Sequence, residues 1–185
     1  MSESHDSFRS TTLALFFTWG VSMQLWAEKG MLQREVALYN ELAEKLDHVY
    51  LFTYGDESDL MYSDQLASNV SIVPKSGVSS NLLYSFLCPL IHWRKLREVD
   101  LLKTNQMLGS WTAMIAKTLY QIPLVVRAGF ILSLFYAKRK QPLPLRVLAT
   151  TLELFAYLYA DGVISSSPHG FNYVENRYWI RGMHE

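Results

Sequence analysis

The sequence has very little cysteine and little charge. Among its 185 residues there is one cysteine, Cys88, and only 18% of the residues are charged. A single cysteine excludes an internal disulfide and a cysteine-ligated zinc site, and it is typical of a protein from a reducing compartment. The five histidines lie far apart without the spacing of metal ligands, so no metal site is expected. Hydrophobic residues make up 50% of the chain, enough for a packed core.

Long apolar runs are also missing. The stretches 10–27 and 76–93 carry no charge, but polar residues interrupt the first and Pro89 interrupts the second. A membrane-spanning helix needs about 20 mostly apolar residues. The start of the chain holds Glu3 and Asp6 against a single Arg9, unlike the basic start of a signal peptide. We therefore expect a cytoplasmic protein that is either soluble or attached to the inner surface of the membrane.

Several motifs that would identify an enzyme class do not occur. The chain lacks G-x-G-x-x-G, the Walker A sequence, G-x-S-x-G and H-E-x-x-H. One glycine, Gly20, follows the first expected strand. A nucleotide-binding domain with a phosphate loop of its own is therefore disfavoured, and no cofactor is expected.

Charge is balanced overall but unevenly distributed. The 17 Lys+Arg equal the 17 Asp+Glu, which disfavours a general nucleic-acid binder. Residues 1–93 hold 5 basic and 11 acidic residues, whereas residues 94–146 hold 10 and 2. Two basic clusters there each follow an apolar stretch: Arg94, Lys95 and Arg97, and then Lys138, Arg139 and Lys140. This combination favours an anionic membrane surface as a partner, the alternative being core helices whose basic ends face water.

Apolar runs alternate with amphipathic segments along the chain. Strands are expected at 12–17, 49–54, 70–73, 99–103, 123–126 and 162–165. Helices are expected at 31–46, 81–97, 109–120, 145–159 and 168–178, with a loop or short helix at 56–65. This alternation predicts an α/β fold, a Rossmann-like and mostly parallel sheet with helices on both faces. We expect a polar tail at 1–11, one domain at 12–180 and a short tail at 181–185.

Ligands of such sheets bind beyond the carboxyl ends of the strands, so the residues after each strand are the candidate site. Those singled out are Trp19, Gly20, Ser22, Trp26, Tyr54, Asn105, Gln106, Arg127 and Gly129. The phrase KTNQMLGSW, followed by an apolar strand and RAGF, lies among them, and ADGVISSS and RYWI close the expected domain.

Together with LFFTWGVSMQLWAEKG and VYLFTYGDESDL, these phrases resemble the amino-terminal domain of family 4 glycosyltransferases, over nearly all of residues 12–180. That family consists of retaining enzymes with two Rossmann domains in the GT-B arrangement. The second domain binds the nucleotide sugar and supplies a paired-glutamate motif. This chain stops at Glu185, where that domain would begin, so the resemblance implies a truncated chain.

The resemblance implies the acceptor-binding half of a transferase that moves a sugar from a nucleotide sugar to a glycan or lipid-linked acceptor, as in bacterial surface polysaccharide synthesis. In this role Trp19 and Trp26 would stack on a sugar, Asn105 would stand where many members have a histidine, and Arg127 would hold an anion. The alternatives are packing in the core or the domain interface for the tryptophans, a helix cap for Asn105, and for Arg127 a structural salt bridge, for example to Glu153 or Asp161. Other functions left open are a non-catalytic module that pairs with a separate donor-binding chain, and an inactive fragment.

Overall fold

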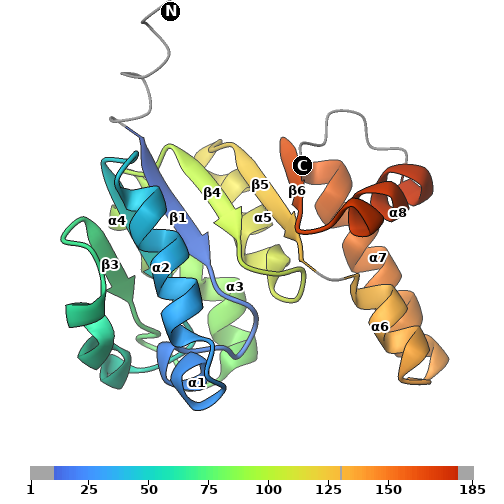
Figure 1. Ribbon diagram of the computed structural model, residues 1–185, viewed down its shortest axis with the longest axis horizontal. Coiled ribbons are helices and arrows are strands. Elements are labelled where there is room, and N and C mark those ends of the chain that lie inside the picture. The colour runs from blue at the N-terminus through green and yellow to red at the C-terminus, as the bar shows by residue number, and fades with distance from the viewer. Residues whose placement is uncertain (1–10, 130, 179–185) are drawn as a thin grey trace, which may run out of the picture.

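The computed structural model describes residues 11–129 and 131–178, so most of the expected tail at 1–11 and all of that at 181–185 lie outside the described residues. Six parallel strands form one sheet in the order β3-β2-β1-β4-β5-β6 (Figure 1). They are β1 (Thr12–Phe16), β2 (His48–Phe52), β3 (Val70–Val73), β4 (Leu101–Thr104), β5 (Leu124–Ala128) and β6 (Gly162–Ser165). The predicted α/β fold with a parallel sheet is confirmed.

The centre of the sheet is its most apolar part. All five residues of β1 are buried, because helices or loops cover the middle of the sheet on both faces. This burial on both sides explains why β1 reads as a continuous apolar run rather than an alternating pattern. β1 and β4 are neighbours, and from this pair the strand order proceeds in opposite directions. Crevices at such a reversal are the usual ligand sites of α/β proteins.

Helices cover both faces of the sheet. In Figure 1, α1 and α2 lie on the viewer's side, whereas α3 and α5 lie behind the strands. The helical segments are α1 (Met23–Glu28), α2 (Leu32–Ala43), the 3-10 segment η2 (Glu57–Gln65), α3 (Asn81–Ile91), α4 (Trp93–Leu96), α5 (Ser110–Tyr120), α6 (Leu132–Lys138), α7 (Leu143–Tyr159) and α8 (Pro168–Tyr178). The hairpin of α6 and α7 extends away from the sheet at the right of the picture.

Three details differ from the sequence prediction. The helix expected at 81–97 is two helices that meet at His92, and the N-cap of the first is Ser80. The Ser80 hydroxyl accepts a hydrogen bond from Leu83 N, which is the usual work of a capping serine. The short helices α1 and α6 were not predicted. The helix expected at 145–159 begins two residues earlier, and many of its apolar side chains are exposed.

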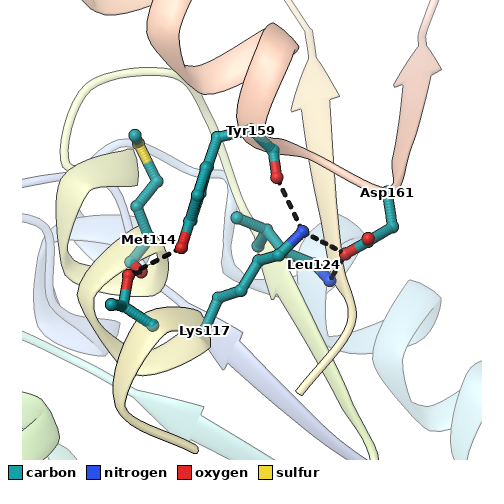
Figure 2. Close-up of polar contacts among 6 residues, drawn as sticks. Met114, Lys117, Leu124, Tyr159 and Asp161 are labelled. Atoms are coloured by element: carbon teal, nitrogen blue, oxygen red, sulfur yellow. Dashed lines mark hydrogen bonds and ion pairs between the residues drawn. The ribbon is translucent and has the colours of Figure 1, made fainter. Parts of the chain in front are cut away.

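A polar cluster fixes α5 to the turn between α7 and β6 (Figure 2). The Lys117 ammonium donates to Tyr159 O at 2.7 Å and pairs with Asp161 at 2.6 Å. The same Asp161 carboxylate accepts Leu124 N at 2.7 Å, so it also fixes the start of β5. The hydroxyls of Thr118 and Tyr159 lie 2.8 Å apart. Since these contacts lie at the amino end of β5 and β6, they leave the carboxyl edge of the sheet free.

Candidate functional site

The loops that follow β1 and β4 are joined at the carboxyl edge of the sheet. Trp19 N donates to Leu108 O at 2.9 Å, and Asn105 N donates to Phe16 O at 2.9 Å. Gly109 makes this close approach possible, because it has φ +100° and a Cβ there would lie 2.9 Å from Trp19 N. Only glycine adopts such a backbone at low cost. The residues after the two central strands therefore form one rigid surface.

A buried carboxylate holds the loop between β1 and α1 in place. Asp59, on η2, is fully buried and accepts hydrogen bonds from Met23 N and Gln24 N, both at 3.1 Å, and from the Thr53 hydroxyl at 2.7 Å. An anion at a helix N-terminus satisfies the first unpaired N–H groups and the helix dipole. Gly55 is required beside it, because a Cβ there would overlap the Asp59 carboxylate. The loops after β1 and β2 are thereby fixed to each other.

Five polar side chains meet on the α2 side of β4 and β5, and we call them the switch-point cluster: Glu35, Tyr39, Lys103, Asn105 and Arg127. The Asn105 side-chain oxygen accepts from the Tyr39 hydroxyl and from Arg127 Nη1, both at 3.4 Å. Arg127 Nη1 lies 3.8 Å from Glu35 Oε2. The Lys103 ammonium lies 5.5 Å from the centre of the Tyr39 ring. The cluster thus joins residues of α2, β4 and β5 with the first residue after β4.

The cluster has more positive than negative charge, and its hydrogen-bonding capacity is only partly used. Burial and, to a smaller extent, the charge of Arg127 lower the pKa of Lys103 to about 8, with Glu35 opposing the shift. Burial raises the pKa of Tyr39, with Arg127 opposing the shift, so the phenol stays a hydrogen-bond donor at neutral pH. Glu35 Oε2 is buried and accepts no hydrogen bond. A guanidinium beside a carboxylate oxygen that accepts no hydrogen bond from the described residues can bind a ligand that both accepts and donates hydrogen bonds.

A second polar side chain, that of Gln106, lies at the same edge beside the end of β5. Gln106 lies against Gly129, where a Cβ would be 2.5 Å from Gln106 Oε1. This Oε1 atom is buried and accepts no hydrogen bond. The Ser166 hydroxyl, after β6, donates to Gly129 O at 3.0 Å. The loops after β4, β5 and β6 therefore continue the polar edge that starts at Trp19.

The structure separates the residues that sequence analysis had grouped around the first strand. Trp19 is 39% exposed at the edge, and the Ser22 hydroxyl caps α1 by accepting Leu25 N at 3.0 Å. Trp26 is buried and stacks on Phe17 with the ring centres 4.1 Å apart, so it packs the core as the alternative interpretation held.

Tyr54 is another predicted site residue that lies in the core. It packs edge-on against Tyr84, and its hydroxyl lies 3.4 Å from Thr112 Oγ1. Burial raises the pKa of Tyr54 to about 12, with the contact to Thr112 opposing the shift. Neither Trp26 nor Tyr54 presents a ring face to a ligand at the edge of the sheet.

Arg127 has a different carboxylate neighbour from the two that were considered. Asp161 pairs with Lys117, and Glu153 accepts hydrogen bonds from Ser133 N and the Tyr178 hydroxyl. The carboxylate near Arg127 is Glu35, and at 3.8 Å the pair is too long for a hydrogen bond. The carboxylate available for a structural salt bridge with Arg127 is therefore Glu35 rather than Glu153 or Asp161.

Sequence analysis did not identify Glu35, Tyr39 or Lys103. Glu35 and Tyr39 stand four positions apart on the buried face of α2. A carboxylate among apolar residues on that face was the sequence signal that could have identified Glu35 as a functional residue. The expected strand 99–103 was otherwise apolar but held two charged residues, Asp100 and Lys103, which was a second signal. In the described ranges no group of three or more His, Cys, Asp or Glu side chains is placed to hold a metal. Within the same ranges, no helix has the length and apolarity to cross a bilayer.

The fold has counterparts among solved structures. HepE from Anabaena, solved with UDP and glucose, matches with a TM-score of 0.55 and 17% identity over 94% of this chain and 43% of that one. Sucrose-phosphate synthase from Thermosynechococcus elongatus matches with a TM-score of 0.57 and 17% identity, over 92% of this chain and 45% of that one. No family model matches the sequence, and no curated protein matches it significantly. The chain spans less than half the length of these neighbours, and its fold is that of the Rossmann-like half of a GT-B glycosyltransferase.

Proposed function

We propose that this chain is the acceptor-binding half of a retaining glycosyltransferase that transfers a sugar from a nucleotide sugar to a glycan or lipid-linked acceptor. The observation that carries the proposal is the switch-point cluster at the reversal of the strand order, within a GT-B-like half. HepE has been solved with UDP-glucose, and the similarity in fold supports a nucleotide sugar as the donor.

The chemistry of the cluster suits a hydroxyl-rich ligand. Glu35 Oε2 accepts a hydrogen bond from a sugar hydroxyl, whereas the free N–H groups of Arg127 donate to a hydroxyl, carboxylate or phosphate oxygen. Trp19 offers an exposed ring on which the apolar face of a sugar stacks. Asn105 orients the other groups but does not act as a base at neutral pH, because an amide is not basic there. These residues bind and orient an acceptor, which lowers the entropic part of the barrier to transfer.

The leaving diphosphate requires cations or N–H groups that develop their full effect in the transition state. In this proposal the donor-binding half supplies most of them, so the 185-residue chain alone is inactive. Calorimetry with a panel of nucleotide sugars that includes UDP-glucose should show binding no tighter than millimolar. Turnover of any nucleotide sugar by the isolated chain would contradict the assignment of an acceptor-binding half.

A screen of saccharides by saturation-transfer NMR tests the acceptor role directly. We expect at least one class of oligosaccharide to bind, and Arg127→Lys to weaken that binding by about tenfold or more, because lysine cannot reproduce the planar fork of N–H groups. Arg94→Lys is the matched control, since Arg94 is exposed on α4 at the other end of the sheet. Failure of all saccharides to bind would favour the non-catalytic module instead. Equal binding by both variants would remove Arg127 from the site.

A further inference from the structure

The hairpin of α6 and α7 combines exposed apolar side chains with basic ones that have no carboxylate partner among the described residues. We define the hairpin surface as its exposed members Leu134, Phe135, Lys138, Arg139, Lys140, Leu143, Leu145, Arg146, Val147 and Leu148. Residues 131–160 contain a single acidic residue, Glu153, and it is fully buried. Among the residues that the structure describes, none pairs a carboxylate with Lys138, Lys140 or Arg146. The surface is therefore both apolar and purely cationic.

The hairpin is anchored firmly at its base. Glu153 on α7 accepts Ser133 N, at the start of α6, at 3.1 Å and the Tyr178 hydroxyl, on α8, at 2.7 Å. These bonds join three helices around one buried carboxylate. The exposed part of the hairpin is therefore a fixed projection from the domain, and its apolar side chains do not turn inward.

A pocket of about 400 Å³ opens beside the hairpin surface between α6, α7 and α8. Its lining combines aliphatic side chains and two guanidinium groups with the hydroxyl-bearing residues Ser133, Thr150, Thr151 and Tyr173; the residues that matter here are Leu134, Ala137, Leu143, Val147, Arg146 and Arg177. Arginine is well suited to a phosphate oxygen, and the adjacent aliphatic side chains are suited to the acyl chains below it. The side chains of the pocket are therefore suited to binding a phospholipid headgroup.

The two basic clusters of the sequence do not converge. Arg94 and Lys95 lie on α4 and Arg97 is its C-cap, just before β4 begins, whereas the tip of the hairpin lies beyond the carboxyl ends of the strands (Figure 1). Arg94 and Arg97 also stack on the Trp93 ring, at 5.4 Å and 4.6 Å from its centre. A flat surface that touches the carboxyl end of the domain therefore meets the hairpin cluster and not the α4 cluster.

We propose that the hairpin surface docks on a bilayer that contains anionic phospholipid, with a lipid phosphate in the pocket beside Arg146 and Arg177. Charge complementarity selects this occupant, because basic residues next to exposed aliphatic and aromatic side chains gain both from lipid charge and from burial in the headgroup region. The hairpin tip and the switch-point cluster lie at the same edge of the sheet, so docking there leaves the cluster close to the membrane. The proposal is independent of the transfer reaction.

Cosedimentation with vesicles tests the docking surface. The chain should bind vesicles of phosphatidylcholine mixed with phosphatidylglycerol, bind vesicles of phosphatidylcholine alone much less, and lose binding as salt is added. The triple change Lys138→Gln, Arg139→Gln and Lys140→Gln should lower partitioning about a hundredfold, since each basic residue at an anionic surface contributes about fivefold. The matched control is Arg94→Gln, Lys95→Gln and Arg97→Gln, which removes the same charge and should retain most of the binding.

A fluorescent label reports which surface enters the lipid. Cys88 is buried and burial raises its pKa to about 12, so a new exposed cysteine reacts selectively. An environment-sensitive dye at Leu143→Cys, where the side chain is 68% exposed, should shift to the blue on anionic vesicles. The same dye at Met61→Cys, on η2 and 71% exposed, should not shift.

Three results would overturn the proposal. The first is equal recovery with neutral and anionic vesicles at all salt concentrations. The second is an equal loss of binding in both triple variants, which would indicate a response to net charge alone. The third is a blue shift at Leu143→Cys without vesicles that rises with protein concentration, since it would assign the hairpin surface to a contact between two copies of the chain.

Discussion

The buried Asp59 carboxylate should be one of the most sensitive single positions in the domain. Three donors converge on it, Met23 N and Gln24 N at 3.1 Å and the Thr53 hydroxyl at 2.7 Å. Asp59→Asn keeps the shape but removes the charge and places an amide N–H₂ against one of these donors. A hydrogen bond to a charged group contributes about 1.5–3 kcal/mol, and an orphaned buried donor costs about 1–3 kcal/mol. We therefore expect a loss of about 3 kcal/mol or more in the free energy of unfolding.

Urea denaturation and thermal melting measure this loss. For a domain of this size about 1 kcal/mol corresponds to about 2–4 °C in Tm, so Asp59→Asn should melt at least about 6 °C below the unmodified chain. Asp64→Asn is the matched control, because Asp64 is exposed on the same 3-10 segment and should change stability by less than about 0.5 kcal/mol. If both variants unfold at the same urea concentration, Asp59 does not fix the loops of the site as argued here.

Three further predictions concern single residues. Lys103 keeps its proton only below about pH 8 in the folded chain, so the free-energy penalty for burying its charge is present at neutral pH and disappears as pH rises towards the ordinary lysine range. The substitution Lys103→Met should therefore raise Tm more near neutral pH than at about pH 10. A gain in Tm that does not vary with pH would contradict this. Gly109→Ala should destabilise the chain by about 1–3 kcal/mol, since the new Cβ meets Trp19 N at 2.9 Å on a backbone with φ +100°, and urea melting of the variant checks it. Partial burial raises the pKa of Asp161, but hydrogen bonds from Lys117 and a backbone N–H outweigh it and leave the pKa below its usual value. The contribution of Asp161 to the free energy of unfolding is present above the usual carboxyl range and is lost as pH falls through that lowered pKa. On acidification, Asp161→Asn should therefore lose less stability than the unmodified chain.

The strands were predictable because their apolar runs are buried on both faces of the sheet. Part of the candidate site was predicted from the same pattern, since Asn105 and Arg127 come at the ends of expected strands. Glu35 and Tyr39 were not found, because they reach the site from α2 and Tyr39 meets Asn105 from 66 positions away. Local periodicity contains no information on such a contact.

The two unpredicted helices have a common physical reason. In addition to the local Ser22 cap of α1, Asp59 accepts N–H groups in the first turn of α1 and Glu153 accepts one in the first turn of α6, and both carboxylates come from other elements. Each helix is short, with six or seven residues, and short helices gain little from their own propensity. Because tertiary contacts stabilise them, neither appears in the hydrophobic pattern of its own segment.

The central claim is that the switch-point cluster binds the acceptor. Amide chemical-shift mapping of the isotope-labelled chain, titrated with the tightest oligosaccharide of the saccharide screen, tests it most directly. The account predicts that the largest shifts fall on Trp19 and Gly20, on Thr104–Gln106 and on Arg127–Gly129, with smaller ones in the first turn of α2. Shifts confined to the outer surfaces of α3, α7 or α8, with those loops unchanged, would contradict it.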